Sequence, residues 1–128
     1  MIRVVLVDDQ PLVRQGLRMR LALEPDISVV GEAGDGATAL SLAQAGSLDV
    51  VVMDVAMPGM DGIAATAALR RLAPRIAVVI HTLHDDAQTE ARARAAGAVA
   101  FVAKRGAADA LLPAIRQAAG SSAGCGPR

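Results

Sequence analysis

The chain is poor in aromatic residues: it has one phenylalanine, Phe101, and neither tryptophan nor tyrosine among its 128 residues. It has one cysteine, Cys125, in a C-terminal stretch rich in Gly, Ser and Pro, which excludes an internal disulfide and fits a reducing compartment. Its 13 basic and 13 acidic residues cancel, which removes any bulk attraction to nucleic acid or acidic membranes. It has no apolar run of membrane-spanning length and no signal-peptide pattern at its N-terminus. These absences predict a soluble cytoplasmic protein.

Short apolar runs alternate with segments of helical spacing along the whole chain. The length suits one domain, and 53% apolar residues suffice for a sizeable core. Gly97 is expected to cap a helix, and Pro113 to kink or shorten the last one. The pattern predicts strands over 2–7, 27–30, 50–53, 76–80 and 99–103, and helices over 11–24, 37–45, 61–73, 86–96 and 107–119. The turn-rich GEAGDG is expected to close the second strand, and residues 120–128 to form a linker or frayed tail.

This alternation predicts an α/β fold with a parallel sheet covered by helices on both faces. The run VVVM at 50–53 has no polar alternation, as expected of a strand buried on both faces. In such sheets, sites form beyond the carboxyl ends of the strands. The polar residues at those ends are three carboxylates, one hydroxyl and the only lysine beside 12 arginines: Asp8, Asp9, Asp54, Thr82 and Lys104.

Three clustered carboxylates repel one another unless a cation joins them or a proton remains bound. A hard divalent ion, Mg²⁺ or Mn²⁺, is the expected partner, with Asp9 and Asp54 as direct ligands and Asp8 as a direct or water-mediated one. The backbone carbonyl of Ala56 could add an oxygen. Carboxylates can act as nucleophiles in phosphoryl transfer, and Asp54, at the end of the central strand, has the best position for this role. Lys104 would neutralise the transferred group, and the Thr82 hydroxyl would donate a hydrogen bond to it.

Each of these residues also has a simpler interpretation. An aspartate after a strand often caps the next helix, as Asp8 or Asp9 could. Asp54 could start a turn, Thr82 could be a β-former or an N-cap, and Lys104 a solvated end-of-strand charge. The functional interpretation gains weight because all these strand ends carry the side chains that phosphoryl transfer needs.

The residues resemble the receiver domain of bacterial two-component response regulators. The motifs that carry the resemblance are VLVDDQPLVRQGL, VVVMDVAMPGMDG, VVIHTLHDD and AGAVAFVAK, and it extends over residues 2–119. The segments DDQPLVRQGL, VVGEAGDG and TLHDD look most like receivers attached to a LuxR-type helix-turn-helix domain. The resemblance implies a flavodoxin-like doubly wound (βα)5 sandwich with strand order 2-1-3-4-5.

The resemblance also implies roles by position. Asp54 would accept phosphate from a sensor histidine kinase, Asp8 and Asp9 would be the acidic metal residues, and Lys104 would pair with the phosphate. Thr82 would be the switch hydroxyl and Phe101 the aromatic switch residue, although Phe101 is about as well explained as a core residue. The readout would be homodimerisation or release of an attached DNA-binding domain that regulates transcription. No membrane partner is expected.

Three positions depart from the usual pattern of the subfamily or limit its chemistry. Gln10 stands where a histidine is common, and Leu83 is bulkier than the small residue that often follows the threonine, so it could narrow access to the site. Ala56, two positions after Asp54, offers no side chain to hold or repel water. On the first helix, Leu12, Val13 and Gly16 are candidates for kinase docking, although core packing explains the two apolar residues at least as well.

Three functions are compatible with the sequence. The first is the phosphoacceptor receiver, at residues 1–119, of a DNA-binding regulator whose output domain is absent from this chain. The second is a stand-alone receiver that acts by binding a partner protein. The third is a Mg²⁺-dependent phosphatase with an aspartate nucleophile, which Ala56 disfavours because such enzymes carry a second aspartate there. The receiver itself would be a phosphoacceptor that catalyses its own phosphorylation and dephosphorylation, not an enzyme. The absence of a Gly-rich P-loop argues against an NTPase.

Overall fold

The computed structural model describes residues 1–104 and 110–123. Strands and helices alternate along that part of the chain. The strands are β1 (Ile2–Val7), β2 (Ile27–Ala33), β3 (Val50–Met53), β4 (Ala77–Thr82) and β5 (Ala100–Ala103). The helices are α1 (Pro11–Leu21), α2 (Gly36–Ala45), α3 (Gly62–Leu72), α4 (Ala87–Ala96) and α5 (Leu111–Ala123).

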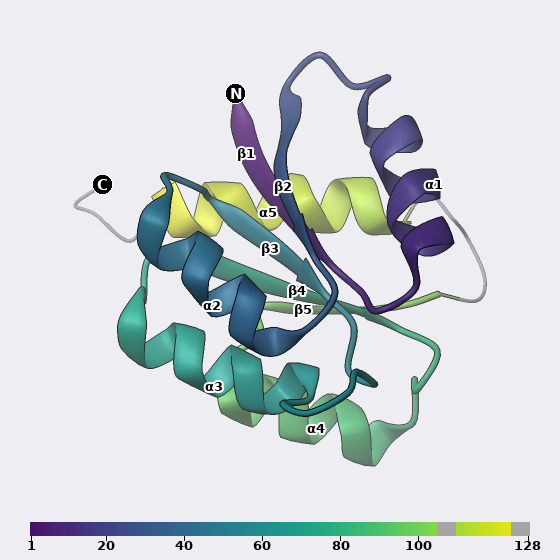
Figure 1. The fold of residues 1–128 in the computed structure, drawn as a ribbon, viewed down its shortest axis with the longest axis vertical. Coiled ribbons are helices and arrows are strands. Elements are labelled where there is room, and N and C mark those ends of the chain that lie inside the picture. The colour runs from purple at the N-terminus through teal and green to yellow at the C-terminus, as the bar shows by residue number, and fades with distance from the viewer. Residues whose placement is uncertain (105–109, 124–128) are drawn as a thin grey trace.

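The five strands form one parallel sheet in the order β2-β1-β3-β4-β5, which confirms the predicted fold. Helices α2, α3 and α4 cover one face, and α1 and α5 cover the other (Figure 1). Alternate residues of each central strand point to opposite faces, so Val51 and Met53 join the core under α2–α4 while Val50 and Val52 join the core under α1 and α5. Every residue of β3 is buried, as its unbroken apolar run predicted.

Three helices begin at an aspartate that caps them. The carboxylates of Asp35, Asp61 and Asp86 accept hydrogen bonds from the backbone N–H three residues further on, at 2.8, 2.8 and 3.0 Å. At the other end of α4, Gly97 adopts a left-handed conformation with φ of 118°, which confirms it as the C-cap. The three aspartate caps fix where the loops at the carboxyl edge of the sheet end.

Tertiary pairing moves some element ends away from the sequence prediction. Strand β2 continues to Ala33, through part of the predicted turn, because Glu32 and Ala33 pair with β1. In the same way β4 extends to Thr82, which pairs with Ala103 of β5. Helix α1 ends at Leu21 rather than near Pro25, in a tight turn in which the N–H of Leu23 donates to the carbonyl of Arg20.

The last helix also differs from the prediction. Pro113 is the third residue of α5, in the first turn, where a helix does not need the missing N–H, and the helix continues past it. The helix runs to Ala123, beyond the predicted end at residue 119. The predicted helix start at residue 107, Cys125 and the rest of the predicted tail lie outside the described residues. Within the described part of the chain, no helix is long and apolar enough to cross a membrane.

Gly62, the first residue of α3, is the position where the backbone leaves least room. A Cβ atom there would lie 1.9 Å from the backbone oxygen of Asp54 and 2.9 Å from the Cα of Val55. We expect Gly62→Ala to lower the free energy of unfolding by about 3 kcal/mol or more, at the upper end of overpacking costs, because backbone atoms must shift. Urea denaturation followed by circular dichroism measures this change.

Gly16→Ala is the matched control, because a Cβ at that helical position meets nothing within 4 Å. It should raise the free energy of unfolding by about 0.5–1 kcal/mol, since glycine is a poor helix former. Equal urea midpoints for Gly62→Ala and the unmodified protein would contradict the packing described.

Candidate functional site

Asp54 is held directly after the buried strand β3. Its N–H donates to the carbonyl of Val7 at 2.9 Å, which extends the pairing of β3 with β1 by one residue. Its carboxylate oxygen Oδ1 accepts a hydrogen bond from the N–H of Val55 at 2.8 Å. The residue is only 7% exposed. The fold therefore presents one nearly buried carboxylate at the carboxyl end of its central strand.

Asp8 lies beside it at the end of β1 and is also buried. Its N–H donates to the carbonyl of Ala33 at 3.0 Å, and its Oδ1 accepts from the N–H of Gln10 at 2.9 Å. Asp9 follows at the surface. One carboxylate oxygen from each of Asp8, Asp9 and Asp54 can be chosen such that all three lie within 4.8 Å of one another. The three predicted acidic residues thus form one cluster.

Lys104 joins this cluster from the end of β5. Its Nζ lies 2.6 Å from Oδ2 of Asp8 and 3.1 Å from Oδ2 of Asp54. All three side chains are at most 12% exposed, so little solvent screens their attraction. Burial disfavours the ammonium, but the hydrogen bonds to Asp8 and Asp54 outweigh it and raise the pKa of Lys104. The lysine is therefore charged at neutral pH and bridges two carboxylates.

The donor set fits a hard divalent cation. Three carboxylates and one ammonium leave two formal negative charges, which one divalent ion would neutralise. The donors are oxygens, which Mg²⁺ and Mn²⁺ prefer. Asp9, the exposed member, makes no side-chain hydrogen bond to the described residues, so its carboxylate is available to a ligand.

Thr82 and Phe101 lie where the sequence placed them, on neighbouring strands. Thr82 is fully buried; its Oγ1 accepts from the N–H of His84 at 3.1 Å, and its carbonyl accepts from the N–H of Lys104 at 2.8 Å. Phe101 pairs with Ile80 across the sheet and is partly buried against the core under α2–α4. Its position is compatible with a core role and with a switch role.

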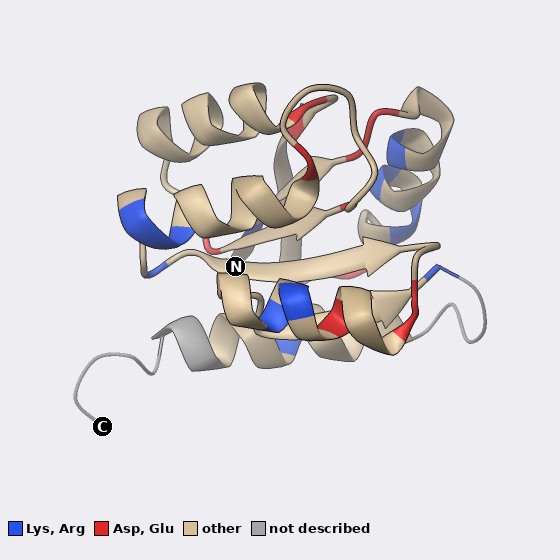
Figure 2. Ribbon diagram, turned by 90° about the horizontal axis from the view of Figure 1, so that it is seen from below, with Lys and Arg blue, Asp and Glu red and all other residues tan. Residues whose placement is uncertain are grey.

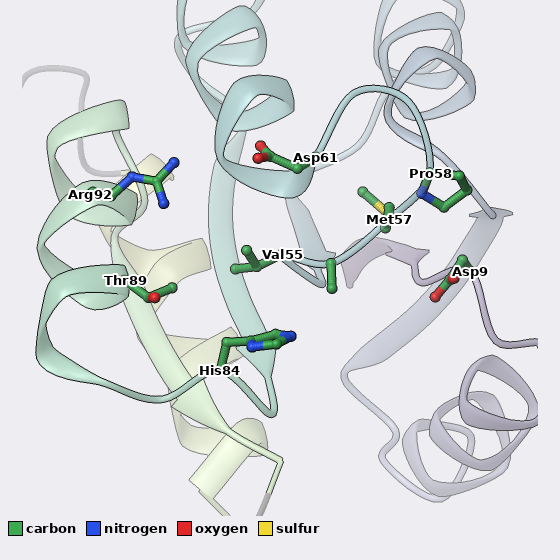
Figure 3. Close-up of a pocket in the computed structure, with 9 residues that line it drawn as sticks. Asp9, Val55, Met57, Pro58, Asp61, His84, Thr89 and Arg92 are labelled. Atoms are coloured by element: carbon green, nitrogen blue, oxygen red, sulfur yellow. The ribbon is translucent and has the colours of Figure 1, made fainter.

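A cavity of about 610 Å³ opens beside the acidic cluster (Figure 3). Asp9 and the loop after Asp54, including Ala56, line one side of it. Three side chains that the sequence analysis did not single out face it from the α4 side: His84, Thr89 and Arg92. Leu83, expected to narrow access, does not line this cavity and is 51% exposed. No spacing rule in the sequence distinguishes His84 from Leu83, because which of the two side chains lines the cavity depends on the path of the loop after β4.

The three candidate residues for kinase docking differ in how exposed they are. Leu12 is 80% exposed, so core packing does not explain it. Val13 is partly buried, and Gly16 is exposed with open space around it. Basic residues occur on α1 and at the end of α3, and both signs occur on α4 (Figure 2). This distribution agrees with the balanced charge of the sequence.

The structure defines a doubly wound α/β domain with an acidic cluster suited to a divalent cation at the carboxyl edge of its sheet, and comparison with known proteins identifies the family. The family model "response regulator receiver domain" matches residues 4–116. The chain belongs to the response regulator receiver domain family.

Similar full-length proteins are bacterial regulators. The nitrate/nitrite response regulator protein NarP of Escherichia coli (strain K12) is 40% identical over 120 residues, which cover 94% of this chain and 56% of NarP. The transcriptional regulatory protein LiaR of Bacillus subtilis (strain 168) is 43% identical over 120 residues, 92% of this chain and 56% of LiaR. The chain therefore spans little more than half the length of these relatives.

Solved structures give the same result. A LuxR-family two-component response regulator from Aurantimonas sp. SI85-9A1 superposes with a TM-score of 0.90 at 35% identity, covering 93% of this chain and 85% of that one. The receiver domain of the response regulator NarL from Mycobacterium tuberculosis gives a TM-score of 0.83 at 36% identity, covering 96% and 97%. The predicted resemblance to LuxR-family receivers is confirmed. Receivers of this family are generally phosphoacceptors that depend on Mg²⁺ and work with sensor histidine kinases.

His81, the residue before Thr82 on β4, makes the stability of the fold depend on pH. This partly buried β4 residue has its pKa lowered from 6.5 to about 4, chiefly by burial and then by the positive charge of Lys104, while Asp8 and Asp54 act in the opposite direction. The folded state thus favours the neutral imidazole. Its contribution to stability is present above pH 6.5 and is lost as the pH falls toward 4.

We expect this histidine alone to remove about 2 kcal/mol from the free energy of unfolding between pH 7 and pH 4.5. Urea denaturation at the two pH values measures the loss. His81→Leu should lose less stability over the same interval, because leucine does not titrate. An equal loss in the two proteins would show that other groups account for the acid sensitivity.

Proposed function

We propose that this chain is the phosphorylation-activated switch of a two-component regulator, with Asp54 as the residue that accepts the phosphoryl group from a sensor histidine kinase. The observation that carries the proposal is the contact of the Lys104 ammonium with both Asp8 and Asp54, beside a third carboxylate. Asp8, Asp9, Asp54 and the backbone carbonyl of Ala56 would hold Mg²⁺ or Mn²⁺. When bound, this ion supplies positive charge to the phosphoryl oxygens.

In the transfer step, an Asp54 carboxylate oxygen forms a bond to phosphorus and the phosphorus–nitrogen bond of the phosphohistidine breaks. The leaving nitrogen keeps the electron pair of that bond. The N–H of Val55 and the Nζ of Lys104 hold the carboxylate in place. Because Lys104 already lies beside Asp54, it is poised to pair with the incoming phosphoryl oxygens, so little reorganisation is needed. Hydrolysis by water would later restore the carboxylate, and Ala56 contributes no side chain to orient or repel that water.

The acyl phosphate would carry nearly two negative charges and three acceptor oxygens. The Thr82 hydroxyl, which accepts from the N–H of His84 in this structure, would turn to donate to one of them. That movement would release the loop before α4 and make room for Phe101. The surface formed by α4 and β5 would then shift from one of its two conformations to the other. The resemblance to receiver domains suggests these roles, and the buried position of Thr82 and the partly buried position of Phe101 are compatible with them.

The readout that we propose is homodimerisation or control of an attached DNA-binding domain that regulates transcription. The relative LiaR is by name a transcriptional regulator, and this chain matches about half of it. The division into a receiver and a tail belongs to this proposal, with the boundary moved from residue 119 to the end of α5 at Ala123. A stand-alone receiver in the cytoplasm that binds a partner protein is the second candidate, and the gene sequence beyond Arg128 distinguishes the two.

The direct test is phosphorylation by a small donor. The protein is incubated with acetyl phosphate and Mg²⁺, and its intact mass is measured. We expect a gain of one phosphoryl group that is absent from Asp54→Asn and from a sample in which the metal is chelated. The variant Asp54→Asn lacks the nucleophile, and the chelated sample lacks the neutralising cation.

No gain in the unmodified protein would contradict the proposal, as would a gain that persists in Asp54→Asn. Continuous release of phosphate from unrelated phosphate esters would favour an aspartate-nucleophile phosphatase instead. Asp49→Asn is a useful control, because this carboxylate accepts a hydrogen bond from the N–H of Arg3 at the opposite end of β3. It should gain phosphate like the unmodified protein.

A further inference from the structure

Arg14 of α1 contacts the backbone of the acidic cluster, whereas Lys104 contacts its carboxylates. Its Nη1 donates to the backbone carbonyl oxygen of Asp8 at 2.5 Å. Its Nε donates to the carboxylate of Glu32, near the end of β2, at 3.1 Å. The side chains of Arg14 and Glu32 are 19% and 28% exposed, so this is a partly buried fork rather than a surface pair. We infer that Arg14 is a positioning residue that fixes the direction of the Asp8–Asp9 peptide and thereby the metal-binding carboxylate of Asp9.

Asp8 is held at four separate atoms. Its N–H donates to Ala33, its Oδ1 accepts from the N–H of Gln10, its Oδ2 accepts from Lys104, and its carbonyl oxygen accepts from Arg14. The first three contacts position the Asp8 backbone nitrogen and side chain. Among the described residues, only Arg14 donates a hydrogen bond to the carbonyl.

That carbonyl matters because a peptide unit is planar. The Asp8 carbonyl and the Asp9 N–H lie in one plane, so holding the carbonyl oxygen also fixes the start of Asp9. Asp9 has no side-chain hydrogen bond to the described residues and is exposed. Its carboxylate is therefore aimed at the cluster by its backbone rather than by side-chain partners. Groups that orient metal ligands in this way commonly affect metal affinity about 10- to 100-fold.

Arg18, four positions after Arg14 on α1, is a control that distinguishes the effect of positioning on Mg²⁺ binding from the effect of charge. Arg18 also pairs with Glu32, but its side chain is 48% exposed and no contact joins it to Asp8. Removing a cation near three carboxylates should by electrostatics alone strengthen Mg²⁺ binding. Loss of the positioning contact should weaken it. The two effects therefore have opposite signs at Arg14, and Arg18 reports the effect of charge alone.

The inference rests on the metal site of the proposed function, and the experiment titrates MgCl₂ into the unphosphorylated protein. Calorimetry or ¹H–¹⁵N NMR serves as the readout, since the chain lacks tryptophan and tyrosine. We expect Arg14→Gln to weaken Mg²⁺ binding about tenfold. Arg14→Lys loses the fork but keeps the positive charge, so it lacks the compensating electrostatic gain and should weaken binding at least as much as Arg14→Gln. Arg18→Gln should bind as tightly as the unmodified protein or slightly more tightly.

A second readout needs no metal. In Mg²⁺-free protein the Asp9 amide resonance should shift in both Arg14 variants and stay in place in Arg18→Gln. If Arg14→Gln does not fold, as judged by circular dichroism, Arg14→Lys decides between the outcomes. Equal or tighter Mg²⁺ binding in a folded Arg14 variant would overturn the positioning role while leaving the proposed function intact. Failure of the unmodified protein to bind Mg²⁺ would overturn the metal site and the inference together.

Discussion

The attraction between one ammonium and two nearly buried carboxylates is the constraint on which the rest of this structure depends. Lys104 comes from the end of β5, Asp8 from the end of β1 and Asp54 from the end of β3. The three side chains meet because parallel strands bring their carboxyl ends to one edge of the sheet. Without the lysine, the edge would hold buried like charges and the fold would lose stability there. The same contact that stabilises the metal-free protein places a positive charge beside the proposed nucleophile.

The fold and the central residues of the site could be predicted because they depend on local patterns. The unbroken apolar run at 50–53 indicated a strand buried on both faces, and the alternation of elements indicated the parallel sheet. Once that topology was fixed, the strand ends selected Asp8, Asp9, Asp54, Thr82 and Lys104 without further information. Family resemblance then supplied the strand order and the roles, of which the order is confirmed.

What could not be predicted depends on contacts between distant residues. Arg14 reaches Asp8 across the β1–α1 loop and Glu32 across 18 positions of sequence, and no spacing rule identifies such a fork among 12 arginines. His84 rather than Leu83 lines the cavity, and this depends on the path of the loop after β4 rather than on a sequence pattern. Strand β2 continues through Gly31, which local propensity assigns to a turn, because pairing with β1 overrides it.

The role of Lys104 is tested most directly by unfolding Lys104→Met with and without Mg²⁺. Without metal, we expect the free energy of unfolding to fall by about 3–5 kcal/mol, because two buried carboxylates lose their shared cation. Saturating Mg²⁺ should stabilise this variant more than the unmodified protein. Arg94→Met, which removes only the exposed pair with Glu90, should change stability by about 1 kcal/mol or less. A Lys104→Met protein as stable as the Arg94→Met control without Mg²⁺ would contradict the account.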